Sequence, residues 1–168
     1  MAEHTIFEQI LTELKNAHCW HESFLHETTV RTSEEAAALR PNYTLSEGAK
    51  ALIVRLKIPH KGKVFAMAVL PGDKKFDSKK LKTAAGASDL RFATEQEVAE
   101  LTSGVRPGGV PPFGHKTALP VLLDASVMAV AEQFAGVIYG GGGDDRTMMK
   151  LTVAELLRVV QPQILAVS

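Results

Sequence analysis

The sequence predicts an α+β domain with a mixed β-sheet and helices packed around it. Two long apolar runs, 49–57 and 64–70, flank a short polar segment, which is typical of a β-hairpin. Amphipathic and capped helical segments precede, separate and follow the predicted strands. Because these elements do not alternate strictly as in a βαβ fold, we expect the sheet to be mixed.

The N-terminal part of the chain is predicted to form two helices and the hairpin. Residues 5–17 place apolar side chains at helical spacing, opposite glutamates and a lysine. A capping box at 32–35 opens a second, short helix over 34–40, which Pro41 ends. Residues 58–63 then join the two strands of the hairpin.

Capping residues and glycines mark the elements of the C-terminal part. Asp77 can cap a helix that runs to Ala85, and Thr94 and Thr152 each begin a capping box. The other predicted elements are a short strand at 90–92, a helix from 94 to about 104, a strand at 119–123 that ends at Asp124, a helix rather than a strand at 126–134, strands at 136–139 and 148–151, and a helix ending by Pro162. We expect one domain over residues 1–168.

Composition limits the classes of function. The chain has 168 residues, of which 45% are hydrophobic and 23% charged, as in a globular protein. Lys plus Arg and Asp plus Glu number 19 each, which disfavours tight nonspecific binding of nucleic acid but allows a local basic patch. The one cysteine, Cys19, forms no internal disulfide, and no signal or membrane-spanning pattern is present, so a cytoplasmic location is expected.

The segment Gly108-Gly109-Val110-Pro111-Pro112-Phe113-Gly114 is the part of the sequence most specified by backbone geometry. Glycines leave amide N–H groups open to a ligand, and the prolines that follow fix φ. A rigid loop with bare amides suits a carbonyl or an oxyanion. On these residues alone, a stiff turn is the favoured interpretation.

No familiar catalytic set is present. Cys19 between His18 and Trp20 is expected to be structural, because sequence adjacency does not place a histidine against a thiol. The histidines at 18, 21 and 26 lack a metal-binding pattern, so we expect no metal site. The segment 140–145 ends in two aspartates that would repel phosphate, and a flexible turn at a pocket mouth is the better interpretation.

Two lysine features remain open at this point. A basic run around the helix that follows Asp77 can be a solvated face or a contact to phosphates, and the two interpretations weigh about evenly. Lys50 leads into an apolar strand and needs water or an anionic partner. The basic run comprises Lys74, Lys75, Lys79, Lys80 and Lys82.

Several of these features in order are typical of one family. They are His26 before Thr32-Ser33-Glu34-Glu35-Ala36, then Gly48-Ala49-Lys50-Ala51-Leu52, Gly72-Asp73, Phe76-Asp77-Ser78-Lys79-Lys80-Leu81, the segment 108–114 and the strand ending at Asp124. With these motifs, from about Ile6 to Val160, the chain resembles the YbaK / prolyl-tRNA synthetase-associated domain family, the aminoacyl-tRNA editing domain. Each motif alone is weak, but their joint order and spacing are specific.

The resemblance implies a fold and an activity. The family fold is a single α+β domain on a mixed, barrel-like β-sheet flanked by helices. The implied activity is hydrolysis of the ester in mischarged aminoacyl-tRNA, here by a free-standing, trans-editing member acting on Ala-, Cys-, Ser- or Thr-tRNA. The expected partners are the 3′ acceptor end of tRNA and, as a second candidate, an aminoacyl-tRNA synthetase, with no cofactor, metal or membrane.

The resemblance also implies site residues. Lys50 matches the family lysine that engages the 3′ end of the tRNA, and Gly108, Gly109 and Pro112 lie in the G-x-x-x-P loop that positions the aminoacyl carbonyl. A polar family residue after the last glycine turn falls near Met148, which leaves that role unassigned. The expected substrate-binding residues are Val110, Phe113, Asp124 and His26, and the expected tRNA-binding residues are Lys79 and Lys80.

Two other functions compete with the deacylase. A non-catalytic module that binds tRNA or a synthetase would show the same basic helix and the same lack of a nucleophile, with salt-sensitive binding but no deacylation. A small-molecule regulator would show neither deacylation nor salt-sensitive binding of tRNA. The lysine run around Lys79 argues mildly against the regulator.

Overall fold

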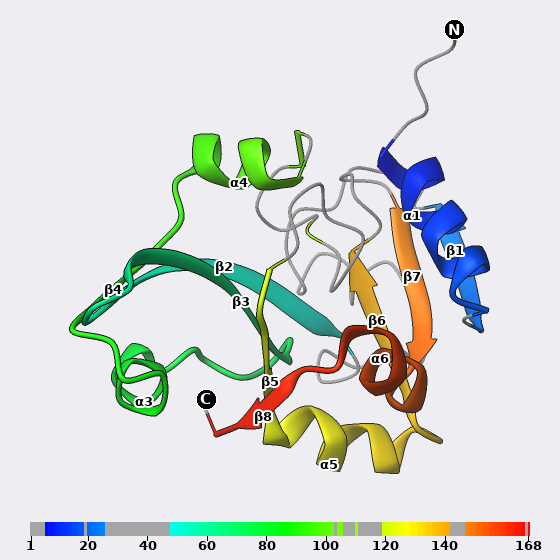
Figure 1. Ribbon diagram of the computed structural model, residues 1–168. Helices are drawn as coiled ribbons and strands as arrows, with labels where there is room; N and C mark the ends of the chain where they lie inside the picture. The colour runs from blue at the N-terminus through cyan, green and yellow to red at the C-terminus, as the bar shows by residue number, and fades with distance from the viewer. Residues whose placement is uncertain are drawn as a thin grey trace, which may run out of the picture.

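Two β-sheets organise the chain (Figure 1). The computed structural model describes residues 6–18, 20–25, 48–102, 104–105, 110, 119–141, 147–166 and 168. Within these residues the protein is an α+β domain, as the sequence predicts. The described helices include none that is long and apolar enough to cross a membrane.

The larger sheet has five strands in the order β4-β2-β3-β5-β8. Its antiparallel part is the predicted hairpin of β2 and β3, with β4 added to the outer edge of β2. Its parallel part is formed by β3, β5 and β8, so the prediction of a mixed sheet is confirmed. The bounds are β2 (Ala49–Ile58), β3 (Gly62–Pro71), β4 (Asp89–Phe92), β5 (Val121–Asp124) and β8 (Gln163–Leu165).

The smaller sheet is antiparallel, with the order β1-β7-β6. Its strands are β1 (His21–Leu25), β6 (Val137–Gly141) and β7 (Thr147–Thr152). A parallel bridge between Gly48 and Tyr139 links it to the start of β2. The expectation of a barrel-like sheet is wrong for the described strands: closure requires the edge strands to pair, and β4 and β8 lie at opposite edges of the larger sheet.

Helices begin where the sequence places capping residues. The Asp77 carboxylate accepts from the amides of Lys79 and Lys80, and the Thr94 hydroxyl accepts from the Glu97 amide at 3.1 Å. The capping box predicted at 32–35 and its helix lie outside the described residues. The described helices are α1 (Ile6–Asn16), α3 (Ser78–Ala84), α4 (Glu95–Thr102), α5 (Ala125–Gln133) and α6 (Val153–Val160).

The five-stranded sheet buries a different cluster on each face. Since side chains alternate along a strand, Val54 and Leu56 of β2 pack with Leu81 of α3 on one face. Ala51 and Ile53 point to the other face, into a larger cluster that also includes residues of α4, α5 and the smaller sheet. In Figure 1, α3 lies beside β4, at the end of the molecule opposite α1 and β1.

Candidate functional site

The candidate site lies at the edge of β2, just beyond the end of β4. At the end of β4 the Ala93 amide donates to the Ile53 carbonyl at 2.9 Å. The Lys57 carbonyl accepts from Ser88 on the same side, so odd-numbered residues of β2 direct their backbone groups toward β4. No described strand pairs with Ala51 on this side. Its backbone N–H and C=O groups therefore point toward the site.

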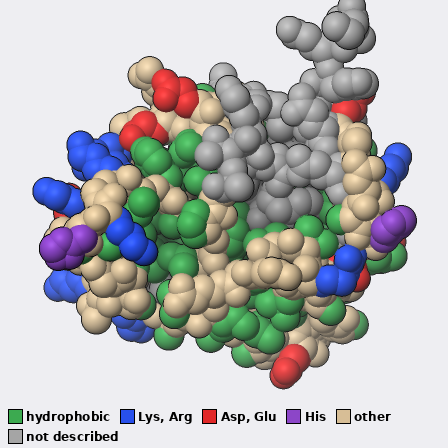
Figure 2. Space-filling model, in the orientation of Figure 1, with side chains coloured by type: hydrophobic (Ala, Val, Ile, Leu, Met, Phe, Trp, Pro, Cys, Tyr) green, Lys and Arg blue, Asp and Glu red, His purple; other side chains and the backbone are tan. Residues whose placement is uncertain are grey.

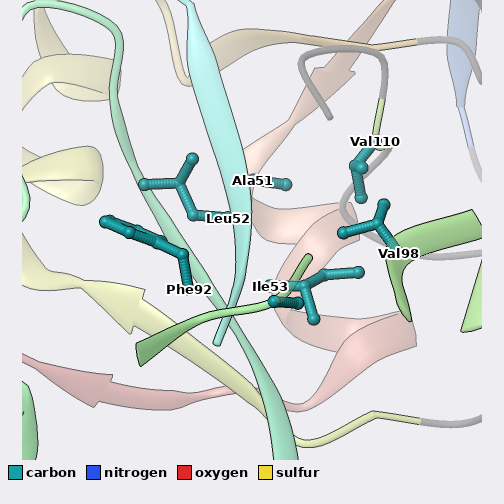
Figure 3. A pocket seen from close by; sticks show the side chains of 7 residues that line it. Ala51, Leu52, Ile53, Phe92, Val98 and Val110 are labelled. Atoms are coloured by element: carbon teal, nitrogen blue, oxygen red, sulfur yellow. The ribbon is translucent and has the colours of Figure 1, made fainter. Parts of the chain in front are cut away.

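An apolar cavity of about 290 Å³ lies against this edge. In Figure 3, Leu52 and Phe92 point to one side of β2, whereas Ile53, Val98 and Val110 lie on the other side. The cavity therefore extends around the strand edge and touches both faces of the sheet. Its described lining is Ala51, Leu52, Ile53, Phe92, Ala93, Val98 and Val110.

Lys50 lies next to this cavity on the face that Leu52 shares. The pairing of β2 with β3 is regular, so Lys50, Leu52 and Val54 point the same way, and Lys50 is about 7 Å along the strand from Leu52. The Lys50 side chain is partly exposed, and no hydrogen bond or ion pair connects it to another described residue. Its ammonium group is thus placed to meet an anion near the cavity.

Val110 connects the glycine- and proline-rich segment to the cavity. The Val110 side chain is only 4% exposed and packs in the same cluster as Ala51, Ile53 and Val98. The chain at position 110 therefore forms part of the wall opposite β2.

An ion pair fixes two other parts of the wall. The guanidinium group of Arg91 donates to both carboxylate oxygens of Glu97, at 2.7 and 3.2 Å. Arg91 precedes Phe92 in β4, and Glu97 precedes Val98 in α4, so the pair sets the spacing of two lining residues. The Arg91 hydrogen bonds, with a further bond from the Thr94 amide, lower the pKa of Glu97 from 4.5 to about 2.

The comparison with family models decides the assignment. The model of the aminoacyl-tRNA editing domain matches residues 27–159, which is most of the chain. The chain belongs to the aminoacyl-tRNA editing domain family. The cavity, Lys50 and Val110 all lie within the matched residues of this editing domain.

Relatives and solved structures agree with this assignment. The proline–tRNA ligase of Bacillus licheniformis is 31% identical over 112 residues, which is 67% of this chain and 18% of that protein. The chain spans about a fifth of the length of the curated relatives it matches. A crystal structure of a hypothetical protein superposes with a TM-score of 0.81 at 28% identity, covering 95% of this chain and 99% of that one. Another, provisionally described as a trans-editing enzyme for prolyl tRNA synthetase, has a TM-score of 0.80 at 26% identity and covers 99% of each chain.

Of the predicted site residues of the editing domain, Val110 lines the cavity, and Lys50 precedes the lining residue Ala51 on β2. Gly108, Gly109, Pro112 and Phe113 lie outside the described residues, as does His26. Met148, near the unassigned family position, is buried in β7, and residues 142–146 before it are also outside the described part. The roles of all these residues stay predictions.

Asp124 is 1% exposed, and its described contacts are structural. Its carboxylate caps α5 through the amide and hydroxyl of Ser126 and accepts from the amide and hydroxyl of Ser168. Asp124 follows Leu123, which pairs with Val69, so it lies two strands from Lys50 at the same end of the sheet. Its substrate-binding role stays a prediction.

The two predicted tRNA-binding lysines, Lys79 and Lys80, differ in the hydrogen bonding of their side chains. Both are exposed on α3, but the Lys80 Nζ donates to the Ser168 carbonyl at 2.7 Å, whereas the Lys79 side chain makes no hydrogen bond to another described residue. Figure 2 shows Lys and Arg side chains gathered at the end of the molecule that holds the β2–β3 hairpin, β4 and α3. Neither contact with tRNA is tested by this arrangement.

Sequence reasoning did not identify Phe92, Val98 or the Arg91–Glu97 pair. A short strand at 90–92 and the capping glutamate were both predicted, but nothing in their pattern indicates a cavity wall. The described residues contain no group of three or more His, Cys, Asp and Glu side chains arranged to hold a metal ion.

Proposed function

We propose that this editing domain is an aminoacyl-tRNA deacylase that acts in trans on mischarged tRNA. The observation that carries the proposal is the apolar cavity lined by Val110 of the glycine- and proline-rich segment and by Ala51 of β2, the residue that follows Lys50. A cavity for a side chain, next to a cation for the RNA, is what an aminoacyl-tRNA requires. The solved structure provisionally described as a trans-editing enzyme for prolyl tRNA synthetase, whose match covers 99% of each chain, supports action in trans.

The chemistry needs no strong nucleophile. Water adds to the carbonyl carbon of the ester, the bond to the ribose oxygen breaks, that oxygen takes a proton, and the amino acid leaves. The amides of residues 108–110 would stabilise the oxyanion, a contribution of about 3–4 kcal/mol for a well-placed donor in other enzymes. The neighbouring ribose hydroxyl would help to activate the water. Lys50 would hold the phosphate or ribose at the 3′ end.

The described lining favours small apolar amino acids. All seven described lining residues have aliphatic or aromatic side chains, so a substrate hydroxyl would find no side-chain partner among them. Among the four expected substrates, we therefore rank Ala- and Cys-tRNA above Ser- and Thr-tRNA. Discrimination rests on desolvation of the hydroxyl and on cavity volume.

The test is a panel of tRNAs charged with Ala, Cys, Ser and Thr, incubated with the wild-type protein and with Lys50→Ala. We expect release of at least one amino acid, and a loss of about 10²-fold or more in Lys50→Ala with an unchanged melting temperature. Lys57→Ala is the matched control, because Lys57 is an exposed lysine on the same strand. If all four tRNAs survive as in buffer while salt-sensitive tRNA binding persists, the non-catalytic module is the better explanation.

Two further parts of the proposal concern a protein partner and the location in the cell. Mischarged tRNA is made by synthetases, and the relatives are proline–tRNA ligases, which supports a synthetase as second partner and the cytoplasm as location. Adding prolyl-tRNA synthetase to the deacylation assay tests the partner: an unchanged rate and no co-elution would exclude it.

A further inference from the structure

Phe92 is an exposed aromatic side chain at the mouth of the cavity. Its side chain is 53% exposed, although it also contributes to the cavity lining. Phe76, from the segment between β3 and α3, supports it from behind: the ring centroids are 5.3 Å apart and the planes are tilted by 51°. Phe76 in turn packs against the buried cluster under α3. One ring is thus anchored, and the other has a face open to solvent.

The aromatic pair lies on the same face of the sheet as Lys50. Phe92 pairs directly with Val54 across the β2–β4 ladder, so the two side chains point to the same face. Val54, Leu52 and Lys50 share that face because they alternate along β2. Figure 3 shows Leu52 and Phe92 on one side of β2, away from Ile53 and Val98. Lys50 and Phe92 therefore lie on the same face, with the lining residue Leu52 between Lys50 and Val54 along β2.

Exposed lysines flank Phe76 in the sequence. Lys74 and Lys75 immediately precede Phe76, and Lys79 follows it on α3; all three side chains are exposed. An apolar ring beside lysines matches a base with its phosphates, a combination that every nucleotide presents, whereas a protein partner would need an apolar group with acidic side chains placed next to it. Charge complementarity thus identifies single-stranded nucleic acid as the occupant.

We propose that Phe92, backed by Phe76, is a stacking platform for the unpaired terminal base of the tRNA 3′ end. This inference rests on the proposed function and names a contact that orients its substrate. In aminoacyl-tRNA, the terminal base and the amino acid are attached to the same ribose. A base platform must therefore lie beside the amino-acid cavity, and Phe92 meets this condition because it both lines the cavity and faces solvent. Unpaired bases in RNA commonly stack on aromatic side chains in this way.

The experiment uses a single-stranded RNA with 2-aminopurine as its 3′-terminal base, titrated with the full chain. We expect its fluorescence to be quenched on binding, and Phe92→Ala to lose the quenching and weaken binding about tenfold. Phe92→Tyr should retain both, because it keeps the aromatic face. Ile164→Ala is the control, since Ile164 is a 45% exposed apolar side chain on β8 at the other edge of the sheet.

Deacylation kinetics provide the second measurement. Phe92→Ala should raise KM about tenfold and change kcat less, with recovery in Phe92→Tyr. Equal RNA affinity and equal KM in Phe92→Ala and the wild type would overturn the platform, even if deacylation itself is established. Conversely, loss of quenching in Phe92→Ala supports the platform even if no charged tRNA is hydrolysed, in which case the deacylase proposal fails alone.

Discussion

The two faces of β2 at the candidate site differ in chemistry, although their residues alternate along one strand. On the α3 face, Lys50 and Leu52 are partly exposed beside Phe92, with lysines nearby. On the interior face, Ala51 and Ile53 are buried against Val98 and Val110. A period of two residues thus places a partly exposed lysine on one face of the strand and buried apolar side chains on the other. Between the two faces lies the edge of β2 at Ala51, with which no strand in the described part of the chain pairs on the β4 side.

The largest expected effect comes from removing side-chain volume on the interior face. Ile53→Ala should lower the free energy of unfolding by about 2–5 kcal/mol, because Ile53 is buried in the main cluster. Leu52→Ala, on the open face of the same strand, should cost about 1 kcal/mol or less. Urea unfolding of both variants measures this difference. Similar losses for the two variants would contradict the assignment of the two faces.

A substrate pair tests the apolar character of the cavity. Cysteine and serine differ by one atom, and the described lining offers the serine hydroxyl no side-chain partner. We expect Cys-tRNA to be hydrolysed about 10²-fold faster than Ser-tRNA at equal concentration. Val98→Thr keeps the side-chain shape and adds a hydroxyl to the lining, so it should lower the ratio of the Cys-tRNA rate to the Ser-tRNA rate. A ratio near one in the wild type would mean that polar groups reach the cavity.

The Arg91–Glu97 pair offers a pH test of the wall that joins the two faces. Because the pKa of Glu97 in the folded state is lowered from 4.5 to about 2, its stabilising effect is complete above 4.5 and disappears as the pH falls toward 2. The wild type should melt at a higher temperature than Glu97→Gln at about pH 6, and the two melting temperatures should become nearly equal at about pH 2. A constant difference between the two proteins across this range would contradict the role of the pair.

The smallest expected effect is a difference in the salt dependence of tRNA binding between variants of Lys79 and of Lys80. Lys79→Ala should reduce the slope of log affinity against log salt by about one for tRNA binding. Lys80→Ala should change it less, because the Lys80 ammonium group already donates to the Ser168 carbonyl at 2.7 Å. Fluorescence anisotropy of labelled tRNA at several salt concentrations measures both slopes. Equal reductions would show that the Lys80 contact gives way to phosphate.

Local signals predicted much of the fold. The hairpin of β2 and β3 followed from two apolar runs around a turn, and the capping residues Asp77, Thr94 and Thr152 each precede a helix in the structure. These features depend on residues within a few positions of each other, so they are readable from the chain. The strands β1 and β8 were not predicted, because five and three residues carry little pattern and are stabilised by partners distant in sequence.

The sequence by itself determined the hairpin, the caps and the family, because short-range patterns and motif order encode them, whereas the role of Lys50 stays a prediction. Only the tertiary structure placed Phe92 on the Lys50 face, brought Val98 and Val110 to the cavity, and joined Arg91 to Glu97. It also showed that the Asp124 carboxylate accepts from Ser168, 44 residues away, in addition to capping α5, for which its position before a predicted helix is a local signal. These contacts depend on strand register and on the packing of α4 against the sheet, which residue patterns do not specify.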